Sequence, residues 1–167
     1  GRIDAFFLGG GQIDGSANIN LVGVGDYPQT RVRFPGSFGS SYLYFLIPKV
    51  ILFREEHTPR TLVEQVDFIS APGTSEPGIY RPGSPAALVT GRCVFDFDRQ
   101  AGRFTLASVH PWSSIDEVSE QTGFSFDLPA DVPVTSVPDA DAAALITGPV
   151  RQQIAETYPA FASSLAP

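Results

Sequence analysis

The chain has 167 residues, of which 43% are hydrophobic, and its Lys+Arg count of 11 against an Asp+Glu count of 18 gives a net charge of -7. That charge repels nucleic-acid phosphates and anionic membrane surfaces, so the sequence predicts neither nucleic-acid binding nor membrane association. The length suffices for one sizeable core, and we expect a single domain over residues 1–167.

The first half of the chain predicts strands separated by turns. Apolar runs at 3–10 ("IDAFFLGG") and 19–25 ("INLVGVG") are typical of buried strands, and "QIDGSANIN" between them has the Asp-Gly and Asn content of a tight connection. Residues 27–41 predict a loop rich in Pro and Gly. The run at 49–55 ("KVILFRE") is the clearest strand, and its consecutive apolar residues predict burial on both faces.

The second half continues this alternation. We expect a strand at 62–70, a Pro/Gly-rich loop at 71–85, and strands at 86–90 and 94–98. A hairpin then turns at Gln100–Gly102.

A helix follows the hairpin. The spacing of Ser114 and Glu117 predicts a capping box, and Gly123 is placed where a helix often ends in a left-handed residue. The tail predicts two short helical pieces split by Gly148–Pro149. The whole pattern indicates an α/β fold with a predominantly buried sheet.

Few residues stand out as reactive. The single cysteine, Cys93, lies between apolar residues and is predicted to be a buried structural thiol, since no base is evident nearby. His110 could orient a polar substrate or serve as a hydrogen-bonded structural histidine. Glu55, Glu56 and His57 follow the strongest strand, but adjacent residues alternate in direction, so they cannot all face one site. We find no metal-ligand spacing, phosphate loop or nucleophile elbow.

Two glycine-containing segments are candidate binding elements. The tract Gly9–Gly11 ends the first strand before Gln12, and it predicts either a tight turn or a bare strand edge against which a ligand could lie. In "PGSFGS", the residues Gly36, Ser37, Phe38 and Gly39 expose backbone N–H groups that could hold a carboxylate, a thioester oxyanion or a phosphate.

Five segments together carry a resemblance. They are "FFLGGGQIDGSANIN", "GDYPQTRVRFPGSFGS", "KVILF" followed by "LVEQVDFISAPG", "LVTGRCVFDFDRQAGRFTLASVHPW" and "EVSEQTGFSFDLP". In this order, from residue 1 to about residue 130, the chain resembles the β subunit of family I CoA-transferases, close to the glutaconate CoA-transferase type. The resemblance implies a mostly parallel buried sheet with flanking helices, and an α subunit as partner in a heterodimer or heterotetramer.

The resemblance also implies a chemistry. A glutamate attacks an acyl-CoA thioester, and CoA passes between carboxylic acids through a glutamyl-CoA thioester, with no permanently bound cofactor. It assigns Gln12 as a catalytic hydrogen-bond donor at the oxyanion. The residues that it implies for acyl-CoA binding are Gly9, Gly10, Gly11, Gly36, Ser37, Phe38 and Gly39.

Departures from the family pattern leave alternatives open. The family's glutamate lies upstream of "LGGGQID", so we expect the chain to lack that N-terminal segment. Phe38 replaces a small loop residue and narrows the expected pocket, and "HPW" at Trp112 replaces the usual His-Pro-Gly. The alternatives are a glutamate-free decarboxylase or hydrolase of a CoA thioester, or a non-catalytic subunit that completes a partner's pocket. A reducing cytoplasm is the expected location.

Overall fold

The chain divides into two compact units, Gly1–Thr135 and Ser136–Pro167, and the computed structural model describes residues 2–165 of it. Each unit is described by itself. The single domain expected over residues 1–167 stays a prediction.

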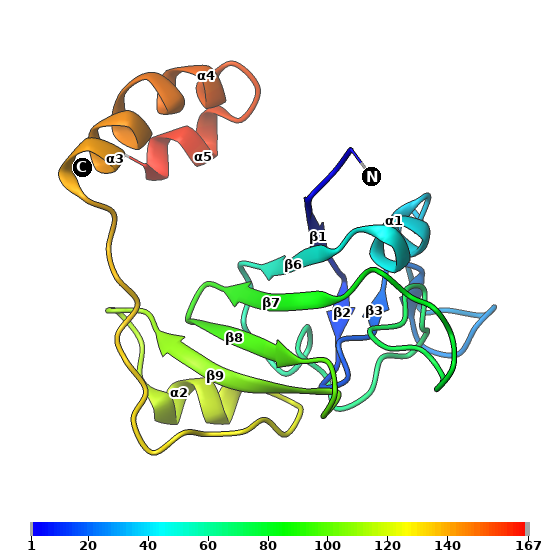
Figure 1. The fold of residues 1–167 in the computed structure, drawn as a ribbon. Helices are drawn as coiled ribbons and strands as arrows, with labels where there is room; N and C mark the ends of the chain where they lie inside the picture. Colours follow the sequence, from blue (N-terminus) through cyan, green and yellow to red (C-terminus); the bar gives the residue numbers. More distant parts are fainter. Residues whose placement is uncertain (1, 166–167) are drawn as a thin grey trace. The chain divides into compact units, whose positions relative to one another are not determined.

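The first unit is built on one five-stranded sheet (Figure 1). In sheet order its strands are β1 (Ala5–Gly9), β6 (Lys49–Arg54), β7 (Pro85–Thr90), β8 (Cys93–Asp98) and β9 (Arg103–Val109). β1, β6 and β7 pair in parallel, and β8 is antiparallel to both of its neighbours, so β8 alone is reversed. This confirms the α/β fold with a mostly parallel sheet.

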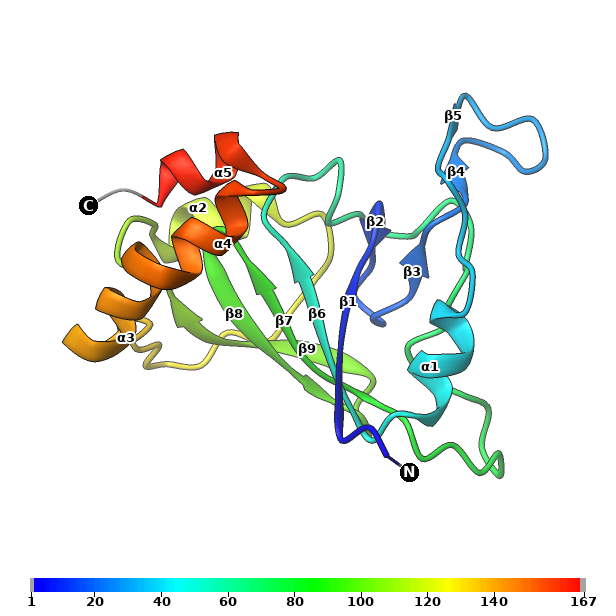
Figure 2. The same ribbon diagram turned by 90° about the horizontal axis from the view of Figure 1, so that it is seen from above.

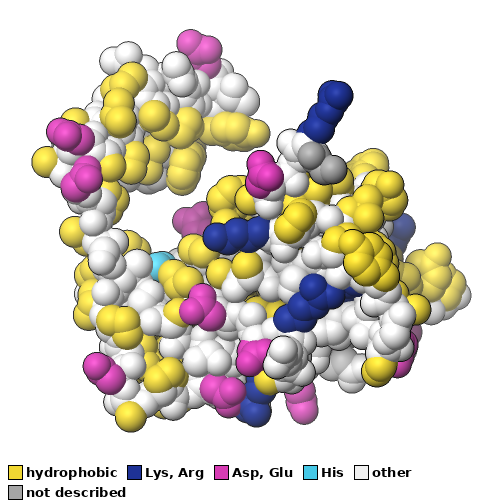
Figure 3. Space-filling model, in the orientation of Figure 1, with side chains coloured by type: hydrophobic (Ala, Val, Ile, Leu, Met, Phe, Trp, Pro, Cys, Tyr) yellow, Lys and Arg dark blue, Asp and Glu magenta, His cyan; other side chains and the backbone are white. Residues whose placement is uncertain are grey.

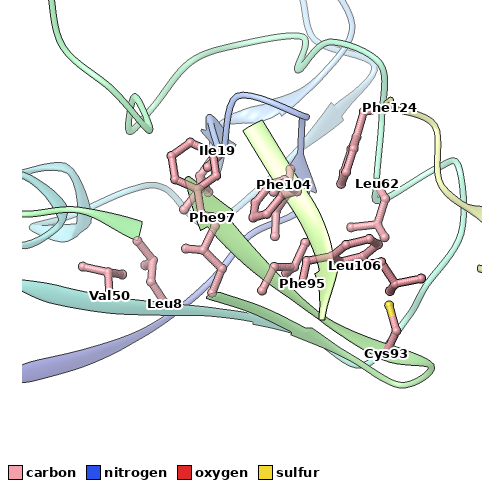
Figure 4. Close-up of a cluster of buried hydrophobic side chains, with 14 of the residues drawn as sticks. Leu8, Ile19, Val50, Leu62, Cys93, Phe95, Phe97, Phe104, Leu106 and Phe124 are labelled. Atoms are coloured by element: carbon pink, nitrogen blue, oxygen red, sulfur yellow. The ribbon is translucent and has the colours of Figure 1, made fainter. Parts of the chain in front are cut away.

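One face of the sheet carries the core (Figure 4). β8 alternates as a half-buried strand should, with Phe95 and Phe97 buried and the carboxylates of Asp96 and Asp98 exposed. Phe95 is fully buried and meets Phe126 edge-on at 5.0 Å between ring centroids.

The other face of the sheet is less covered than the apolar run at 49–55 predicts. In β6, Leu52 is fully buried whereas Phe53 is 49% exposed. Phe7 of β1 is 63% exposed, and it shares this face with Phe53 because Phe7 pairs with Ile51 in the parallel register. Hydrophobic side chains are visible on the surface over helix α1 (Ser40–Leu46) and β6 (Figure 3). Burial on both faces is therefore incomplete within this unit.

A hairpin follows β1. β2 (Gln12–Ile13) and β3 (Ile19–Asn20) pair antiparallel, and the carboxylate of Asp14 accepts hydrogen bonds from the backbone N–H groups of Ser16 and Asn18, both at 3.0 Å. This is the tight connection expected from the Asp-Gly and Asn content, since Asp side chains bond backbone groups a few residues on.

The strand expected over 19–25 is broken in two. Asn20 Oδ1 accepts hydrogen bonds from the N–H groups of Val22 at 2.9 Å and Gly23 at 3.2 Å, which turns the chain within the apolar run. β4 (Gly23–Val24) then pairs with β5 (Val32–Arg33) as a separate hairpin.

The strand predicted at 62–70 is wrong. That segment has no strand and wraps around the first hairpin. The N–H of Val66 donates to the carboxylate of Asp14 at 3.4 Å, and the N–H of Asp67 donates to the side chain of Gln12 at 3.1 Å. Two of its backbone donors are thus used by side chains, whereas those of Val63 and Ser70 make single bonds to the carbonyls of Ile13 and Ile19, so no continuous strand ladder forms.

Helix α2 (Ile115–Gln121) begins as predicted. Ser114 Oγ accepts from the N–H of Glu117 at 3.2 Å, and the Glu117 carboxylate accepts from the N–H of Ser114 at 3.1 Å. The left-handed end expected at Gly123 is wrong, because the helix ends in extended backbone at Thr122. Gly123 is instead required by packing: a Cβ there would lie 2.4 Å from the carbonyl oxygen of Leu62.

The second unit is helical. Its segments are α3 (Ala140–Leu145), the single π turn η1 (Ile146–Val150), α4 (Arg151–Ala155) and α5 (Pro159–Ser164). Gly148 has non-helical angles (φ -100°, ψ -106°), which confirms the predicted break at Gly148–Pro149. None of the helices within residues 2–165 has the length and apolar character that crossing a membrane requires.

A buried polar cluster links β7, β8 and α2. Thr122 donates its hydroxyl hydrogen to the carbonyl of Val118 at 2.7 Å, so its oxygen accepts from His57 Nε2 at 2.9 Å. His57 Nδ1 lies 2.8 Å from the hydroxyl oxygen of Thr90, which in turn lies 3.2 Å from the carbonyl oxygen of Cys93 in β8. Burial lowers the pKa of His57 to about 4, so it is a neutral, structural histidine.

The other two candidate reactive groups are also structural. Cys93 is free and fully buried, and burial raises the pKa of its thiol to about 12, as expected for a structural cysteine. His110 bonds Thr135 Oγ1 through Nδ1 at 2.9 Å and the carbonyl of Thr90 through Nε2 at 3.0 Å. Both ring nitrogens are thus occupied by the protein.

Arg81 is a buried cation in the long loop 71–85. Its guanidinium lies over the ring of Tyr44 at 5.0 Å, and it donates to the carbonyl oxygens of Gly83 at 2.9 Å and Tyr44 at 3.2 Å. The ion pairs among residues 2–165 do not include Arg81. A ring face, the carbonyl of Tyr44 near the end of α1 and the loop carbonyl of Gly83 therefore compensate its charge.

The low pKa of His57 predicts a pH-dependent stability. The folded protein holds His57 neutral down to about pH 4, whereas the unfolded chain binds the proton from about 6.5. Stability is therefore full above about 6.5 and falls as the pH drops toward 4, by about 3 kcal/mol from this residue. Urea denaturation at several pH values measures it. His57→Asn should lose stability at neutral pH and show a shallower pH dependence than wild type; equal slopes would contradict this account.

Arg81→Met keeps the apolar stem but removes every donor. We expect the free energy of unfolding to fall by about 2–4 kcal/mol, because two carbonyls lose their donor and the ring contact is lost. Arg103→Met is the matched control, since Arg103 is exposed and pairs with Asp127 on the surface at 2.6 Å. That change should cost under about 1 kcal/mol. If urea denaturation shows equal losses of unfolding free energy for the two variants, the hydrogen bonds and ring contact of Arg81 contribute nothing to stability.

Candidate active-site cleft

A cleft of about 1210 Å³ opens at the carboxyl ends of β1 and β6. These two ends point toward one edge of the sheet, where the chain continues from β1 into β2 (Figure 2). Ligands of parallel α/β sheets bind at this edge. The lining comes from the glycine tract and Gln12, from residues 53–56 at the end of β6, from the β4–β5 hairpin, and from the segment 59–67.

The three glycines are explained by close packing on one side and the cleft on the other. A Cβ at Gly10 would lie 2.8 Å from Cγ2 of Ile19, and a Cβ at Gly11 would lie 2.3 Å from Cε2 of Phe34. Gly9 has only ordinary contacts with Phe53. Gly10 and Gly11 therefore let the hairpin and Phe34 close onto the strand, while all three glycines line the cleft.

Gln12 is the polar group that the strand end presents to the cleft. It is 5% exposed, and its Oε1 accepts from Asn20 Nδ2 at 2.6 Å and from the N–H of Asp67 at 3.1 Å. Both partners are donors, so the carboxamide oxygen must face them and Nε2 must face away. No hydrogen bond within residues 2–165 uses Nε2, which leaves it as an available donor in the cleft.

Charged side chains form one rim of the cleft. Glu56 accepts from Arg60 Nη2 at 2.6 Å and from Arg54 Nη2 at 2.9 Å. The hydrogen bond from Arg60 holds the pKa of the Glu56 carboxyl below its usual range. Glu55 and Glu56 line the cleft whereas His57 lies in the buried cluster, so the three residues do not all face one site, although strict alternation would have separated Glu55 from Glu56. A carboxylate engaged in this way is a poor nucleophile.

The loop 36–39 lies outside the lining of this cleft, which ends at Pro35 in that segment. Phe38 is 91% exposed, so it narrows no space formed by the described residues. It holds a φ of 42°, and Gly36 a φ of 114°. The carbonyl of Ser37 accepts from the N–H of Ser40 at 3.0 Å, and Gly39 immediately precedes α1.

Sequence reasoning missed several lining residues. Arg54 ends a parallel strand, and that position could have marked it as a candidate. Phe34 and Asp67 come from irregular segments with no periodic signal. In the part of the chain that the structure describes, no three His, Cys, Asp or Glu side chains group in a way that could hold a metal ion. The cleft thus offers a neutral donor beside backbone without side chains, which suits a developing oxyanion.

Comparison with known proteins gives the chain a family context. A family model described as Coenzyme A transferase matches residues 1–121. The chain is 34% identical over 145 residues to the B-type subunit of 3-oxoadipate CoA-transferase from Pseudomonas knackmussii, covering 83% of this chain and 55% of that protein. It is 33% identical over 129 residues to the B-type subunit of glutaconate CoA-transferase from Acidaminococcus fermentans, covering 73% and 48%.

Solved structures share the fold. Glutaconate coenzyme A-transferase of Acidaminococcus fermentans superposes with a TM-score of 0.76 at 30% identity, over 86% of this chain and 57% of that one. IpdAB of Rhodococcus jostii gives a TM-score of 0.79 at 28% identity, over 86% and 59%. The decarboxylase AibA/AibB gives 0.76 at 26% identity, over 99% and 62%.

The chain spans about half the length of the curated relatives that it matches. The match nevertheless runs through β1, the glycine tract, the hairpin and the sheet to the end of α2. These are the elements that form the cleft and the core beneath it. The chain belongs to the Coenzyme A transferase family.

Proposed function

We propose that this chain is part of the B-type subunit of an enzyme that moves CoA between carboxylic acids, with Gln12 as its oxyanion donor. The observation that carries the proposal is the unoccupied Nε2 of Gln12 in the cleft at the carboxyl ends of β1 and β6. Relatives that are named as B-type subunits of 3-oxoadipate and glutaconate CoA-transferases support dicarboxylic acids as acceptors.

The proposed chemistry begins with attack of a carboxylate on the thioester carbonyl. The carbonyl oxygen becomes an oxyanion, CoA leaves as a thiolate, and a mixed anhydride remains. The thiolate then attacks the anhydride on the enzyme's side, which releases the first acid and leaves an enzyme–CoA thioester. A second acid reverses these steps. Each tetrahedral intermediate carries an oxyanion that Gln12 Nε2 can stabilise.

The attacking carboxylate is assigned to no residue of this chain. Glu56 is held by two arginines, and the Asp67 carboxylate accepts from the N–H of Gly25 at 2.7 Å. Glu55 is exposed at the rim. The chain's own contribution to the reaction is therefore the donor, the bare backbone beside it and the walls of the cleft.

The proposed enzyme also contains a partner subunit. Relatives are named as subunits of larger enzymes, and IpdAB and AibA/AibB are solved as two-component proteins. The exposed rings of Phe7 and Phe53 offer apolar area for such contacts. An α-type subunit of the same family is the proposed partner, and the free thiol of Cys93 suits a reducing cytoplasm.

Hydrolysis or decarboxylation of a CoA thioester is the second candidate. A cholesterol ring-cleaving hydrolase IpdB subunit is 30% identical over 152 residues, and AibA/AibB is a decarboxylase of the same fold. Neither reaction changes the demand for an oxyanion donor, because water attack and enolate formation both place negative charge on the thioester oxygen. A subunit that only completes a partner's pocket would leave Gln12 without a catalytic role.

An assay of the chain with its partner subunit separates CoA transfer from hydrolysis of the thioester. Acetyl-CoA is incubated with and without glutaconate or 3-oxoadipate, and both free CoA and new acyl-CoA are measured. A transferase forms the new thioester only when an acid is present and releases no net CoA. Release of CoA without an acceptor would identify a hydrolase and overturn transfer.

The matched variant for Gln12 is Gln12→Glu. It keeps an acceptor oxygen for Asn20 and Asp67 but replaces the Nε2 donor with a second oxygen. We expect kcat to fall by about a hundredfold with little change in melting temperature. Gln12→Ala should lower both, because it also removes the two hydrogen bonds that Oε1 accepts.

Gln100→Ala is the control, since Gln100 is exposed at the β8–β9 turn. It should leave both kcat and melting temperature unchanged. Loss of stability in Gln12→Glu with full turnover of the folded enzyme would remove Gln12 from the site and leave it a turn residue.

We also propose that loop 36–39 contacts the acyl-CoA, with Phe38 lying against the acyl group in the assembled enzyme. An exposed aromatic side chain at positive φ is strained, and such positions cluster at ligand-binding segments.

Phe38→Gly should therefore change the relative kcat/KM across short, branched and dicarboxylic acyl-CoAs by about tenfold, which is the scale of a lost hydrophobic contact. The melting temperature should not change, because Gly adopts this φ freely. An unchanged substrate preference would leave the loop a structural connection to α1.

A further inference from the structure

We propose that Asn20 is the positioning residue that aims the Gln12 carboxamide into the cleft. The inference rests on the proposed role of Gln12 and extends it to a residue that touches no substrate. Asn20 is fully buried and does not line the cleft. Any effect of Asn20 on turnover must therefore pass through another side chain.

The orientation of Asn20 is fixed by backbone groups. Its Oδ1 accepts from the N–H groups of Val22 and Gly23, so its amide nitrogen must point the other way. The two Nδ2 hydrogens go to the carbonyl of Gly23 and to Oε1 of Gln12, each at 2.6 Å. All four hydrogen bonds of the Asn20 carboxamide have fixed partners. The carboxamide therefore cannot rotate without losing them.

Asn20 thereby dictates which end of Gln12 faces the cleft. A rotated Gln12 carboxamide would place its NH₂ group against the Nδ2 donor of Asn20 and the N–H donor of Asp67. That arrangement loses two hydrogen bonds and brings donors together at a buried position. The unrotated form points Nε2 at the cleft before any substrate arrives, which is what preorganised oxyanion stabilisation requires.

The hairpin register makes this contact possible. Gln12 and Asn20 are directly paired across β2 and β3, and the N–H of Gly11 donates to the carbonyl of Asn20 at 2.9 Å. Neighbouring side chains of such a pair lie on the same face. The backbone therefore holds the two carboxamides side by side.

Asn20→Asp tests the assignment with an isosteric change. The aspartate keeps an oxygen for the N–H groups of Val22 and Gly23, but its second oxygen faces Gln12 and the Gly23 carbonyl, which lowers stability. A carboxylate accepts from Nε2, so rotation of the Gln12 carboxamide gains a charge-assisted hydrogen bond, loses the weaker one from the Asp67 N–H, and turns the amide oxygen to the cleft. We expect kcat to fall by about ten- to a hundredfold, with KM for acetyl-CoA changed less than about threefold. The enzyme is assayed with its partner subunit, using glutaconate or 3-oxoadipate as acceptor.

Asn18→Asp is the matched control. It makes the same substitution in the same hairpin, but Asn18 contacts Asp14 and the N–H of Gly73 and makes no hydrogen bond to Gln12. It should lower melting temperature without lowering the kcat of folded enzyme. If Asn20→Asp behaves like this control, the positioning role is overturned.

A double variant separates action through Gln12 from a general effect on the hairpin. In the Gln12→Glu background there is no donor left to aim, so adding Asn20→Ser, which places no second carboxylate at this contact, should lower kcat no further. Additive losses would overturn the inference. Full turnover of Gln12→Glu alone would instead defeat the proposed role of Gln12, on which the inference rests.

Folding is monitored by circular dichroism, melting temperature and assembly with the partner. Asn20→Ser is the second variant, since its shorter side chain withdraws the amide donor from Gln12 without adding charge. A folded Asn20→Ser enzyme with lowered kcat and near-normal KM supports positioning. Failure of both Asn20 variants to fold would show that Asn20 serves only the hairpin and would overturn the assignment.

Discussion

The packing of Ile19 and Phe34 against the backbone of Gly10 and Gly11 is the constraint on which the cleft depends. Side chains at these two glycines would overlap Ile19 at 2.8 Å and Phe34 at 2.3 Å. Because the glycines admit this contact, the β2–β3 hairpin closes directly onto the end of β1. The cleft then has bare backbone on one side and Gln12 at its edge.

The two ends of one carboxamide serve different purposes in this arrangement. Oε1 of Gln12 joins the two strands of the hairpin through Asn20, and it holds the hairpin to the segment that follows β6 through the N–H of Asp67. Nε2 remains available to a ligand. The hypotheses of a turn residue and a catalytic donor are therefore compatible, and only substitutions that alter one end at a time can separate them.

The sequence predicted the elements whose signals are local. Alternation in β8, the capping box at Ser114 and the break at Gly148 all depend on neighbours within a few residues. The strand expected at 62–70 failed because the N–H groups of Val66 and Asp67 bond side chains of the hairpin, more than fifty positions away in the chain. For Gly123 the deciding contact is the carbonyl of Leu62. Nothing in a local pattern reports such contacts.

The same distinction applies to the cleft. The resemblance pointed to Gln12 and the glycine tract, whereas Asn20 and Asp67 emerged only from the hydrogen bonds in the folded chain. Under the proposed function, these supporting groups fix a donor without choosing what attacks the thioester. In that proposal a carboxylate, a water molecule or a departing carboxyl group each leaves negative charge on the same oxygen, and one preoriented N–H stabilises it in every reaction. The proposed chemistry is therefore decided by the group that faces Gln12 across the cleft, and the hairpin that holds Gln12 suits each of these reactions unchanged.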